Sequence, residues 1–146
     1  METDWDDLLD DFGWAIADLQ PREFLIIDYL TPDIDLWPYA QVAHESNGLY
    51  YCEVASTYSL PEEFWPIDEL LLAASGWEPP WQSQANWSQI VDTSVEAVHR
   101  LVDALRRGRS CPDPARFIGT RGKWSPPPDG PEPEPSLPWG PFDLAA

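Results

Sequence analysis

A run near the middle of the chain, YAQVAHESNGLYYCEVAS, constrains the fold most strongly because it reads as a β-hairpin. Two strand-forming runs flank Asn47 and Gly48, the dipeptide that two-residue type I′ hairpin turns prefer. Such a turn pairs His44 with Tyr51 and places His44 and Cys52 on opposite faces of the sheet. An earlier run, EFLIIDYL, is short, apolar and rich in strand-forming residues. We therefore expect three antiparallel strands, at residues 23–30, 38–45 and 49–56.

A helix is expected before these strands. Thr3 can cap it, apolar residues then recur at three- and four-residue spacing, and Pro21 ends it. The other side of this helix carries aspartates, among them Asp4, Asp7 and Asp11. Calcium sites usually wrap their ligands in a loop with a glycine turn. We therefore interpret these aspartates as a solvated helix face and predict no metal site.

Two further helices are expected after the strands. The second has Pro66 in its first turn and Gly76 at its C-terminal end. The third begins at Thr93 and Glu96, which have the spacing of a capping box. The residues predicted to face the core are Ile67, Leu70, Leu71 and Ala74 in the second helix, and Val95, Val98, Leu101, Val102 and Leu105 in the third.

The connector between these two helices, SGWEPPWQSQANWSQI, holds three tryptophans but has neither a helical nor a strand period. Trp77 and Trp87 are expected to pack into the core, with Trp87 on a short strand-like segment that closes it. Trp81 has polar neighbours and is expected to stay exposed. The indole rings would thus fasten the connector to the domain.

The C-terminal part of the chain differs in composition from the rest. Ten of the 17 prolines lie between Pro112 and Pro141, and the apolar periodicity stops after Gly108. Such a composition favours extended conformations over a packed core. We expect a folded domain over residues 1–118 and a proline-rich, disordered tail over residues 119–146. Within this tail, Trp139, Phe142 and Leu144 are predicted to form a short docking motif. The last three residues, Leu144, Ala145 and Ala146, also resemble the end of a bacterial degradation tag.

The charge of the chain is strongly negative and unevenly distributed. The formal net charge is −18, and residues 1–99 hold 20 acidic residues against Arg22 alone. Such a charge disfavours nucleic acid and anionic membranes as direct partners and favours a basic protein. No apolar run approaches the ~20 residues that span a bilayer, and the acidic start does not resemble a signal peptide. With two cysteines and no disulfide framework, we expect a cytoplasmic protein.

Several short motifs occur in the order and spacing of a known family. The matching positions are Tyr39 and Gln41, Glu53 and Ser56, Gly76, Trp77 and Pro80, Asn86 and Trp87, and Leu105 and Arg106. Over residues 5–118 the chain thereby resembles the TY-Chap family of small bacterial domains, which are grouped with type III secretion chaperones and YbjN-like proteins. Ser75 stands where the family usually has leucine.

This resemblance implies both a fold and a function. The fold is α+β, of the type III secretion chaperone-like kind: an N-terminal helix, a three-stranded antiparallel sheet that one or two short strands could extend, and two further helices. The implied function is chaperone-like binding of a peptide or protein client, without catalysis and without a cofactor. Secretion chaperones of this shape are commonly dimers, so the resemblance also implies a homodimer.

The residues themselves offer little for catalysis. His44 and His99 are the only histidines, and nucleophilic catalysis by Cys52 would need a base within hydrogen-bond reach of its thiol. The hairpin register expected above separates His44 from Cys52. The sequence also has no glycine-rich phosphate loop and no serine nucleophile elbow. We therefore predict that the protein is not an enzyme.

Seven aromatic residues are candidate contacts for a client, because aromatic side chains are enriched at the centres of interfaces. They are Tyr39, Tyr50, Tyr51, Tyr58, Phe64, Trp65 and Trp81. We expect two or three of them to be exposed and the rest to pack. The alternative function is an acidic decoy, which would present carboxylates to a nucleic-acid-binding protein in place of phosphates. Binding that salt abolishes would distinguish the decoy from a peptide binder.

Overall fold

The computed structural model describes residues 4–32, 37–81 and 84–123. In chain order the helices and strands are α1 (Trp5–Ala17), β1 (Glu23–Tyr29), β2 (Tyr39–His44), β3 (Tyr50–Val54), α2 (Glu69–Ala74), β4 (Trp87–Val91), α3 (Ser94–Asp103) and β5 (Phe117–Lys123). A π-helical turn, Ala104–Gly108, continues α3, and a 3-10 turn, Pro114–Arg116, precedes β5. None of the described helices combines the length and the apolar character needed to cross a membrane.

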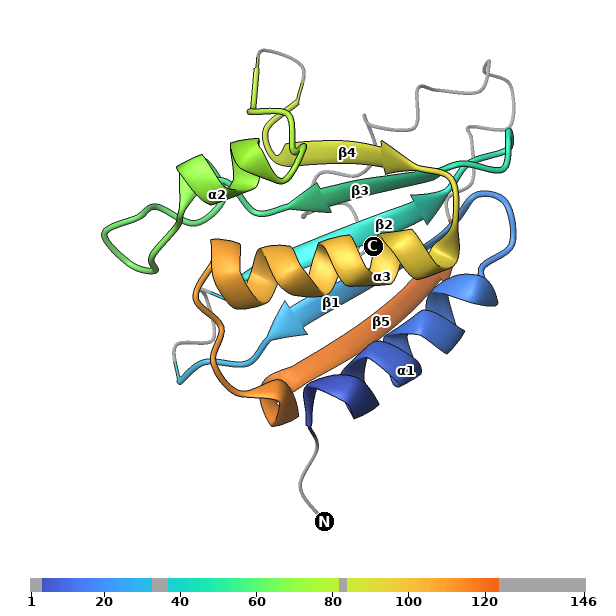
Figure 1. Cartoon of the computed structure of the whole chain (residues 1–146), viewed down its shortest axis with the longest axis horizontal. Helices are drawn as coiled ribbons and strands as arrows, with labels where there is room; N and C mark the ends of the chain where they lie inside the picture. Colours follow the sequence, from blue (N-terminus) through green and yellow to red (C-terminus); the bar gives the residue numbers. More distant parts are fainter. Residues whose placement is uncertain (1–3, 33–36, 82–83, 124–146) are drawn as a thin grey trace.

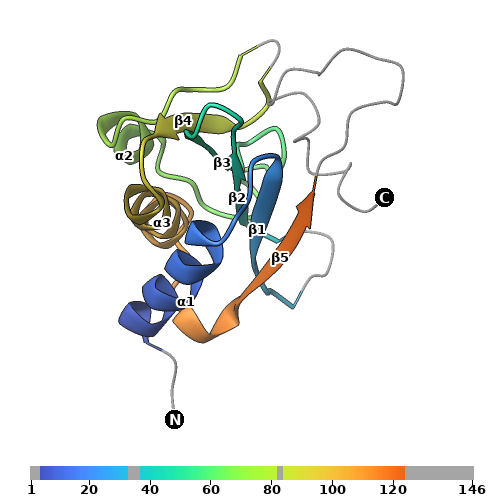
Figure 2. The same cartoon turned by 90° about the vertical axis from the view of Figure 1, so that its right-hand side faces the viewer.

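The strands form one five-stranded antiparallel sheet in the order β4-β3-β2-β1-β5. The helices α1 and α3 lie side by side over one face of this sheet, and α2 lies near the C-terminal end of α3 (Figures 1 and 2). The predicted α+β fold is confirmed. The three predicted strands form the centre of the sheet, and β4 and β5 extend it at its two edges.

The main core lies between the sheet and the two long helices. Leu8, Phe12 and Ile16 of α1 and Val98 and Leu101 of α3 pack there against the inward side chains of all five strands. Burying each such side chain stabilises the fold by about 1.5–3 kcal/mol. Together they make α1 and α3 integral to the domain.

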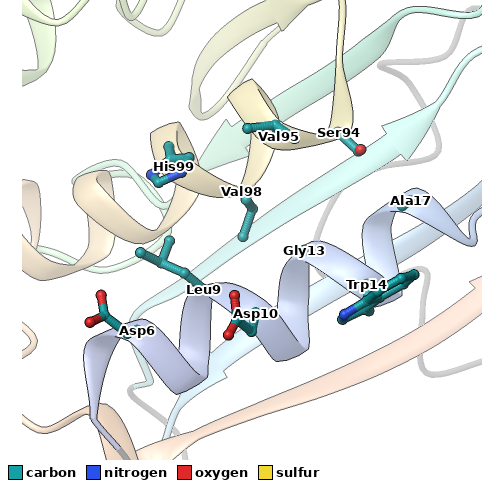
Figure 3. Close-up of a pocket in the computed structure, with 10 residues that line it drawn as sticks. All are labelled: Asp6, Leu9, Asp10, Gly13, Trp14, Ala17, Ser94, Val95, Val98 and His99. Carbon is teal, nitrogen blue, oxygen red and sulfur yellow. The ribbon is translucent and has the colours of Figure 1, made fainter.

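Two predictions for the helices were wrong in detail. Asp68 caps α2, because its carboxylate accepts the Leu71 N–H at 3.0 Å, so the helix starts at Glu69 and is only six residues long. This start turns Leu72 into the core and leaves Leu70 85% exposed. In the first turn of α3, Val95 lies outside the core and is 65% exposed, and it lines a surface hollow together with residues of α1 (Figure 3).

The hairpin between β2 and β3 has a longer loop than predicted. The Gly48 N–H donates to the Glu45 carbonyl at 3.0 Å, Gly48 has a φ of +89°, and His44 pairs with Tyr50. This is the pattern of a three-residue loop, a type I turn closed by a left-handed glycine. The register therefore differs from the expected one, and His44 and Cys52 lie on the same face of the sheet, not on opposite faces.

The tryptophans of the connector lie as predicted. Trp77 and Trp87 are buried in the main core, Trp87 as the first residue of β4, whereas Trp81 is exposed. Gly76, at a φ of +89°, ends the turn after α2 and sends the chain back toward the sheet. The backbones of Glu78 and Ser88 then exchange two hydrogen bonds, which fastens the connector along the outer edge of β4.

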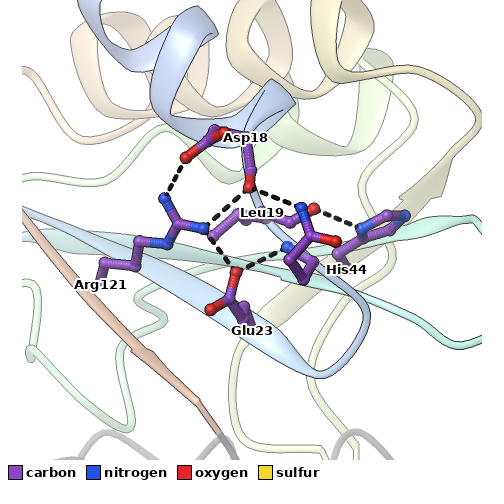
Figure 4. A network of polar contacts seen from close by, with 6 residues as sticks. Asp18, Leu19, Glu23, His44 and Arg121 are labelled. Atoms are coloured by element: carbon purple, nitrogen blue, oxygen red, sulfur yellow. Dashed lines mark hydrogen bonds and ion pairs between the residues drawn. The ribbon is translucent and has the colours of Figure 1, made fainter.

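The strand β5 is joined to the end of α1 by Arg121 (Figure 4). Its Nη1 donates to the Asp18 carboxylate at 2.7 Å, and its Nη2 donates to the Asp18 carbonyl at 2.8 Å and to Glu23 Oε1 at 2.5 Å. Nearby, His44 Nδ1 lies 2.8 Å from the carbonyl oxygen of Leu19. The domain boundary expected at residue 118 falls inside β5, which continues to Lys123.

The first helix begins with a capping box. The Asp4 carboxylate accepts the Asp7 N–H at 2.8 Å, and the Asp7 carboxylate accepts the Asp4 N–H at 3.4 Å. Asp4 thus occupies the capping position predicted for Thr3, which lies outside the described residues. Two of the aspartates of this helix therefore have a structural role at its N-terminus.

We predict that Asp4→Ala lowers the free energy of unfolding by about 1 kcal/mol, the usual effect of losing an N-cap. Asp6→Ala is the matched control, because it removes a carboxylate from the same turn without touching the cap. Urea unfolding followed by circular dichroism measures both. Equal losses in the two variants would contradict the capping role of Asp4.

Candidate functional site

A buried carboxylate lies on the sheet face that the helices do not cover. The pairing of β2 with β3 sets Gln41 opposite Glu53, and Glu53 is only 2% exposed. Gln41 Nε2 donates to Glu53 Oε2 at 2.8 Å, and Gln84 Nε2 donates to Glu53 Oε1 at 3.0 Å. Both carboxylate oxygens thus accept hydrogen bonds from side-chain amides, one on β2 and one on the connector.

Asn86 extends this network to the loop after β3. Its Nδ2 donates to the Tyr39 hydroxyl at 3.0 Å, and its Oδ1 accepts the Ser59 hydroxyl at 2.8 Å and the Ser56 N–H at 3.4 Å. The Ser56 hydroxyl also donates to the carbonyl of Ala85 at 2.5 Å. These bonds fix residues 56–59 against the connector.

Burial dominates the electrostatics of the network. It raises the pKa of Glu53 to about 7, although hydrogen bonds from Gln41, Asn86 and Gln84 act in the opposite direction. Burial also raises the pKa of Tyr39 and of Tyr51 to about 12. Both hydroxyls therefore remain protonated near neutral pH.

Arg109 fixes the segment between β3 and α2. The side chain is fully buried, and its Nη2 donates to the carbonyls of Leu60 at 2.9 Å and Trp65 at 3.4 Å. In return, Trp65 Nε1 donates to the Arg109 carbonyl at 2.5 Å. Burial lowers the pKa of Arg109 to about 10, so the guanidinium stays charged at neutral pH, although its Nε and Nη1 have no hydrogen-bond partner among the described residues.

The loop and the connector that the Glu53 network joins both line a surface groove, together with α2. This groove, which we call the α2–connector groove, has a volume of about 460 Å³. It is lined by Thr57, Tyr58, Glu69, Leu70, Ala73, Pro79, Pro80 and Trp87. Tyr58 is 79% exposed and Leu70 is 85% exposed, so the groove presents large apolar side chains to solvent.

Of the seven aromatic residues predicted as contacts, one lies in this groove. Tyr58 lines it, whereas Phe64 and Trp81 are exposed but are not among its lining residues. The other four are held by internal contacts: Tyr39 and Tyr51 by the Glu53 network, Tyr50 by stacking on His44, and Trp65 by Arg109. The predicted tail motif, Trp139, Phe142 and Leu144, lies outside the described residues.

Leu70 is a groove residue that the sequence analysis assigned to the core. The signal that could have found it is the run Leu70, Leu71 and Leu72, because three successive residues of a helix cannot all face one side. Only Leu72 is buried. Leu70, two positions before it, points away from the core and lines the groove.

Cys52, the cysteine considered for catalysis, is not an activated nucleophile. Cys52 shares a sheet face with His44, but burial raises the pKa of its thiol, and the His44 ring stacks on Tyr50 at a centroid distance of 4.6 Å. A thiol in such surroundings is a poor source of thiolate. Across residues 4–32, 37–81 and 84–123, no three side chains of the metal-ligating kinds lie close enough to hold an ion. The arrangement is suited to binding through apolar and polar surfaces.

The comparisons with known proteins identify a family. Residues 1–122 match the TY-Chap3 family model, described as T3SS (YopN, CesT) and YbjN peptide-binding chaperone 3. Comparison with curated proteins and with solved structures gives no match. The motif positions that suggested the resemblance include Tyr39, Gln41, Glu53, Ser56 and Asn86, which form the buried network.

We predict that the Glu53 carboxyl makes the domain less stable as the pH rises from about 4.5 to about 7. Its pKa is about 7 in the folded chain against an ordinary value of 4.5. Across that interval the unfolded chain releases the proton while the folded chain keeps it, so stability is lost as the pH rises and the loss levels off above the folded pKa. A pKa difference of this size corresponds to roughly 3 kcal/mol.

Glu53→Gln should remove this dependence, because the amide has no proton to lose and a turned Gln41 amide can still bond to it. Urea unfolding at pH 5, 6, 7 and 8 gives the free energy of unfolding of both proteins. The free energy of unfolding of the variant should increase relative to that of wild type as the pH rises. If the free energies of unfolding of the two proteins changed equally with pH, the raised pKa of Glu53 would be contradicted.

Proposed function

The chain belongs to the TY-Chap3 family of T3SS (YopN, CesT) and YbjN peptide-binding chaperones, and on this premise we propose that it binds a client segment in the α2–connector groove without catalysis. The observation that carries the proposal is the position of the family motif residues. Ser56 and Asn86 belong to the buried network, and Pro80 and Trp87 line the groove itself. The motifs therefore coincide with this groove and with the network that supports it.

The groove is suited to a short apolar segment of the client. Tyr58, from the loop after β3, and Leu70, from α2, offer exposed apolar contacts, and Pro79 and Pro80 stiffen the connector that also lines the groove. Stiff walls limit the conformational entropy that binding would otherwise cost. These features support a client side chain inserted between Tyr58 and Leu70.

The surroundings of the groove favour basic residues on either side of that segment. Glu69 lines the groove, and Glu62, Glu63 and Glu78 are exposed on the segments next to it. Complementary charge speeds encounter and selects among partners more than it adds affinity. We propose a client with one or two apolar residues flanked by lysine or arginine.

We also propose that this binding takes place in the cytoplasm. Cys52 and Cys111 are both free and both buried, which fits a reducing compartment. The strongly acidic composition is compatible with a basic protein client and with the alternative of an acidic decoy. The two functions differ in what holds the partner: apolar contacts in the groove, or charge alone.

The proposal is tested by selecting peptides from a random display library on the full chain at physiological salt. We expect the selected peptides to contain an apolar residue with basic neighbours. Tyr58→Ala and Leu70→Ala should each lower the affinity for these peptides by roughly tenfold or more, as expected for an anchor position. Both side chains are exposed, so the fold should tolerate the changes. Fluorescence anisotropy of the labelled peptides measures the dissociation constants.

Ile90→Ala is the matched control, because Ile90 is an exposed apolar residue that does not line this groove. Failure to select any peptide, or unchanged affinity in both groove variants, would contradict the proposal. Loss of all binding on raising the salt, with both groove variants behaving as wild type, would instead support the acidic decoy.

A further inference from the structure

A second groove lies between the two long helices, away from the α2–connector groove. In Figure 3, α1 and α3 run side by side in opposite directions, and the side chains along their facing edges line the hollow. We call this the α1–α3 groove; its volume is about 480 Å³. From α1 it is lined by Asp6, Leu9, Asp10, Gly13, Trp14 and Ala17.

This groove exposes large apolar side chains that the core does not use. Trp14 is 78% exposed and Val95 is 65% exposed, although both belong to helices that are packed against the sheet. The buried stripe of α1 consists of Leu8, Phe12 and Ile16, and Trp14 lies off it. Exposed apolar patches of this kind mark interaction sites on soluble domains.

Gly13 forms the floor of the groove in the middle of α1. Glycine at an interior helical position destabilises a helix by about 1 kcal/mol relative to alanine. A Cβ at Gly13 would approach only Val98 Cγ1, at 3.7 Å, which is an ordinary contact. No packing inside the domain therefore requires glycine here, whereas a partner that approaches α1 closely would.

The rim of the groove is acidic. Asp6 and Asp10 stand along it, and Asp7 and Asp11 are exposed on the same helix. Within the described part of the chain, none of the four forms an ion pair. A second copy of this chain would bring the same acidic rim against it. The C-terminal residues 124–146 would also be repelled, because they contain four acidic residues and no lysine or arginine.

We infer that the α1–α3 groove docks an amphipathic helix of a basic partner. The lining residues of α1 run from Asp6 to Ala17, which is 12 positions and about 16 Å at 1.5 Å per step, the length of three helical turns. A helix satisfies its own backbone hydrogen bonds, whereas an extended strand would leave its backbone groups unpaired against these apolar side chains. The partner helix carries apolar residues at spacings of three and four, with lysine or arginine along both sides.

The probe is a synthetic 14-residue amphipathic peptide, labelled with fluorescein, with leucines along one helical face and lysines elsewhere. Two control peptides are used: a scrambled peptide of the same composition, and a peptide with glutamate in place of each lysine. Fluorescence anisotropy with the full chain gives the dissociation constants. The amphipathic peptide should bind at least about tenfold more tightly than either control peptide.

Gly13→Leu is the decisive variant, because leucine favours the helix but fills the floor of the groove. This variant should bind the amphipathic peptide roughly tenfold or more weakly than wild type. Its melting temperature should equal or exceed that of wild type. Trp14→Ala should weaken binding of this peptide to a similar extent, because tryptophans that become buried on binding are frequent anchors. Trp81→Ala, an exposed tryptophan on the connector, should leave the affinity unchanged.

Equal binding of the scrambled peptide would overturn the inference, because charge alone would then account for the affinity. Unchanged affinity in Gly13→Leu would overturn it as well, as would self-association in sedimentation that this variant abolishes. The groove differs from that of the proposed function. If the amphipathic peptide does not bind but Tyr58-dependent binding is intact, only this inference is removed. If the amphipathic peptide binds as expected but Tyr58-dependent binding is absent, only the proposed function is removed.

Discussion

The carboxylate of Glu53 is buried without a basic partner among the described residues, and the arrangement of the surrounding segments follows from this constraint. A buried carboxylate is costly unless hydrogen bonds replace its hydration. The donors are Gln41, Gln84 and Asn86, which lie on β2 and on the connector. Because all must reach one carboxylate, the connector has a single position over the sheet. An apolar contact in the same place would fix that position less strictly.

The two faces of the sheet therefore have different roles. The face under α1 and α3 is apolar and supplies most of the stability through burial. The other face combines a small apolar cluster around Phe24 and Ala43 with the Glu53 network. Through Asn86 and Ser56, this network positions the loop that carries Tyr58. The stability of the fold and the geometry of the groove thus rest on different sets of side chains.

The sequence predicted the elements well and their detailed geometry less well. Strand alternation and the Asn47-Gly48 turn signal gave the three central strands, but that dipeptide suits both two- and three-residue loops, so the register could not be decided. In α2, the choice of Asp68 as the cap decided which leucine is buried. The burial of Glu53 was invisible because its donors Gln41 and Gln84 lie 12 and 31 residues away.

Three positions break a local rule of protein stability. Glu53 is a buried carboxylate, Arg109 is a buried guanidinium with two unpartnered nitrogens among the described residues, and Gly13 interrupts a helix without an internal reason. Natural chains keep such exceptions mainly where function requires them. Through Asn86, Glu53 supports the loop that carries Tyr58, Arg109 holds the carbonyls of Leu60 and Trp65, and Gly13 lines the α1–α3 groove. Under the two binding proposals, these exceptions share one explanation, namely two preformed binding surfaces on one small domain.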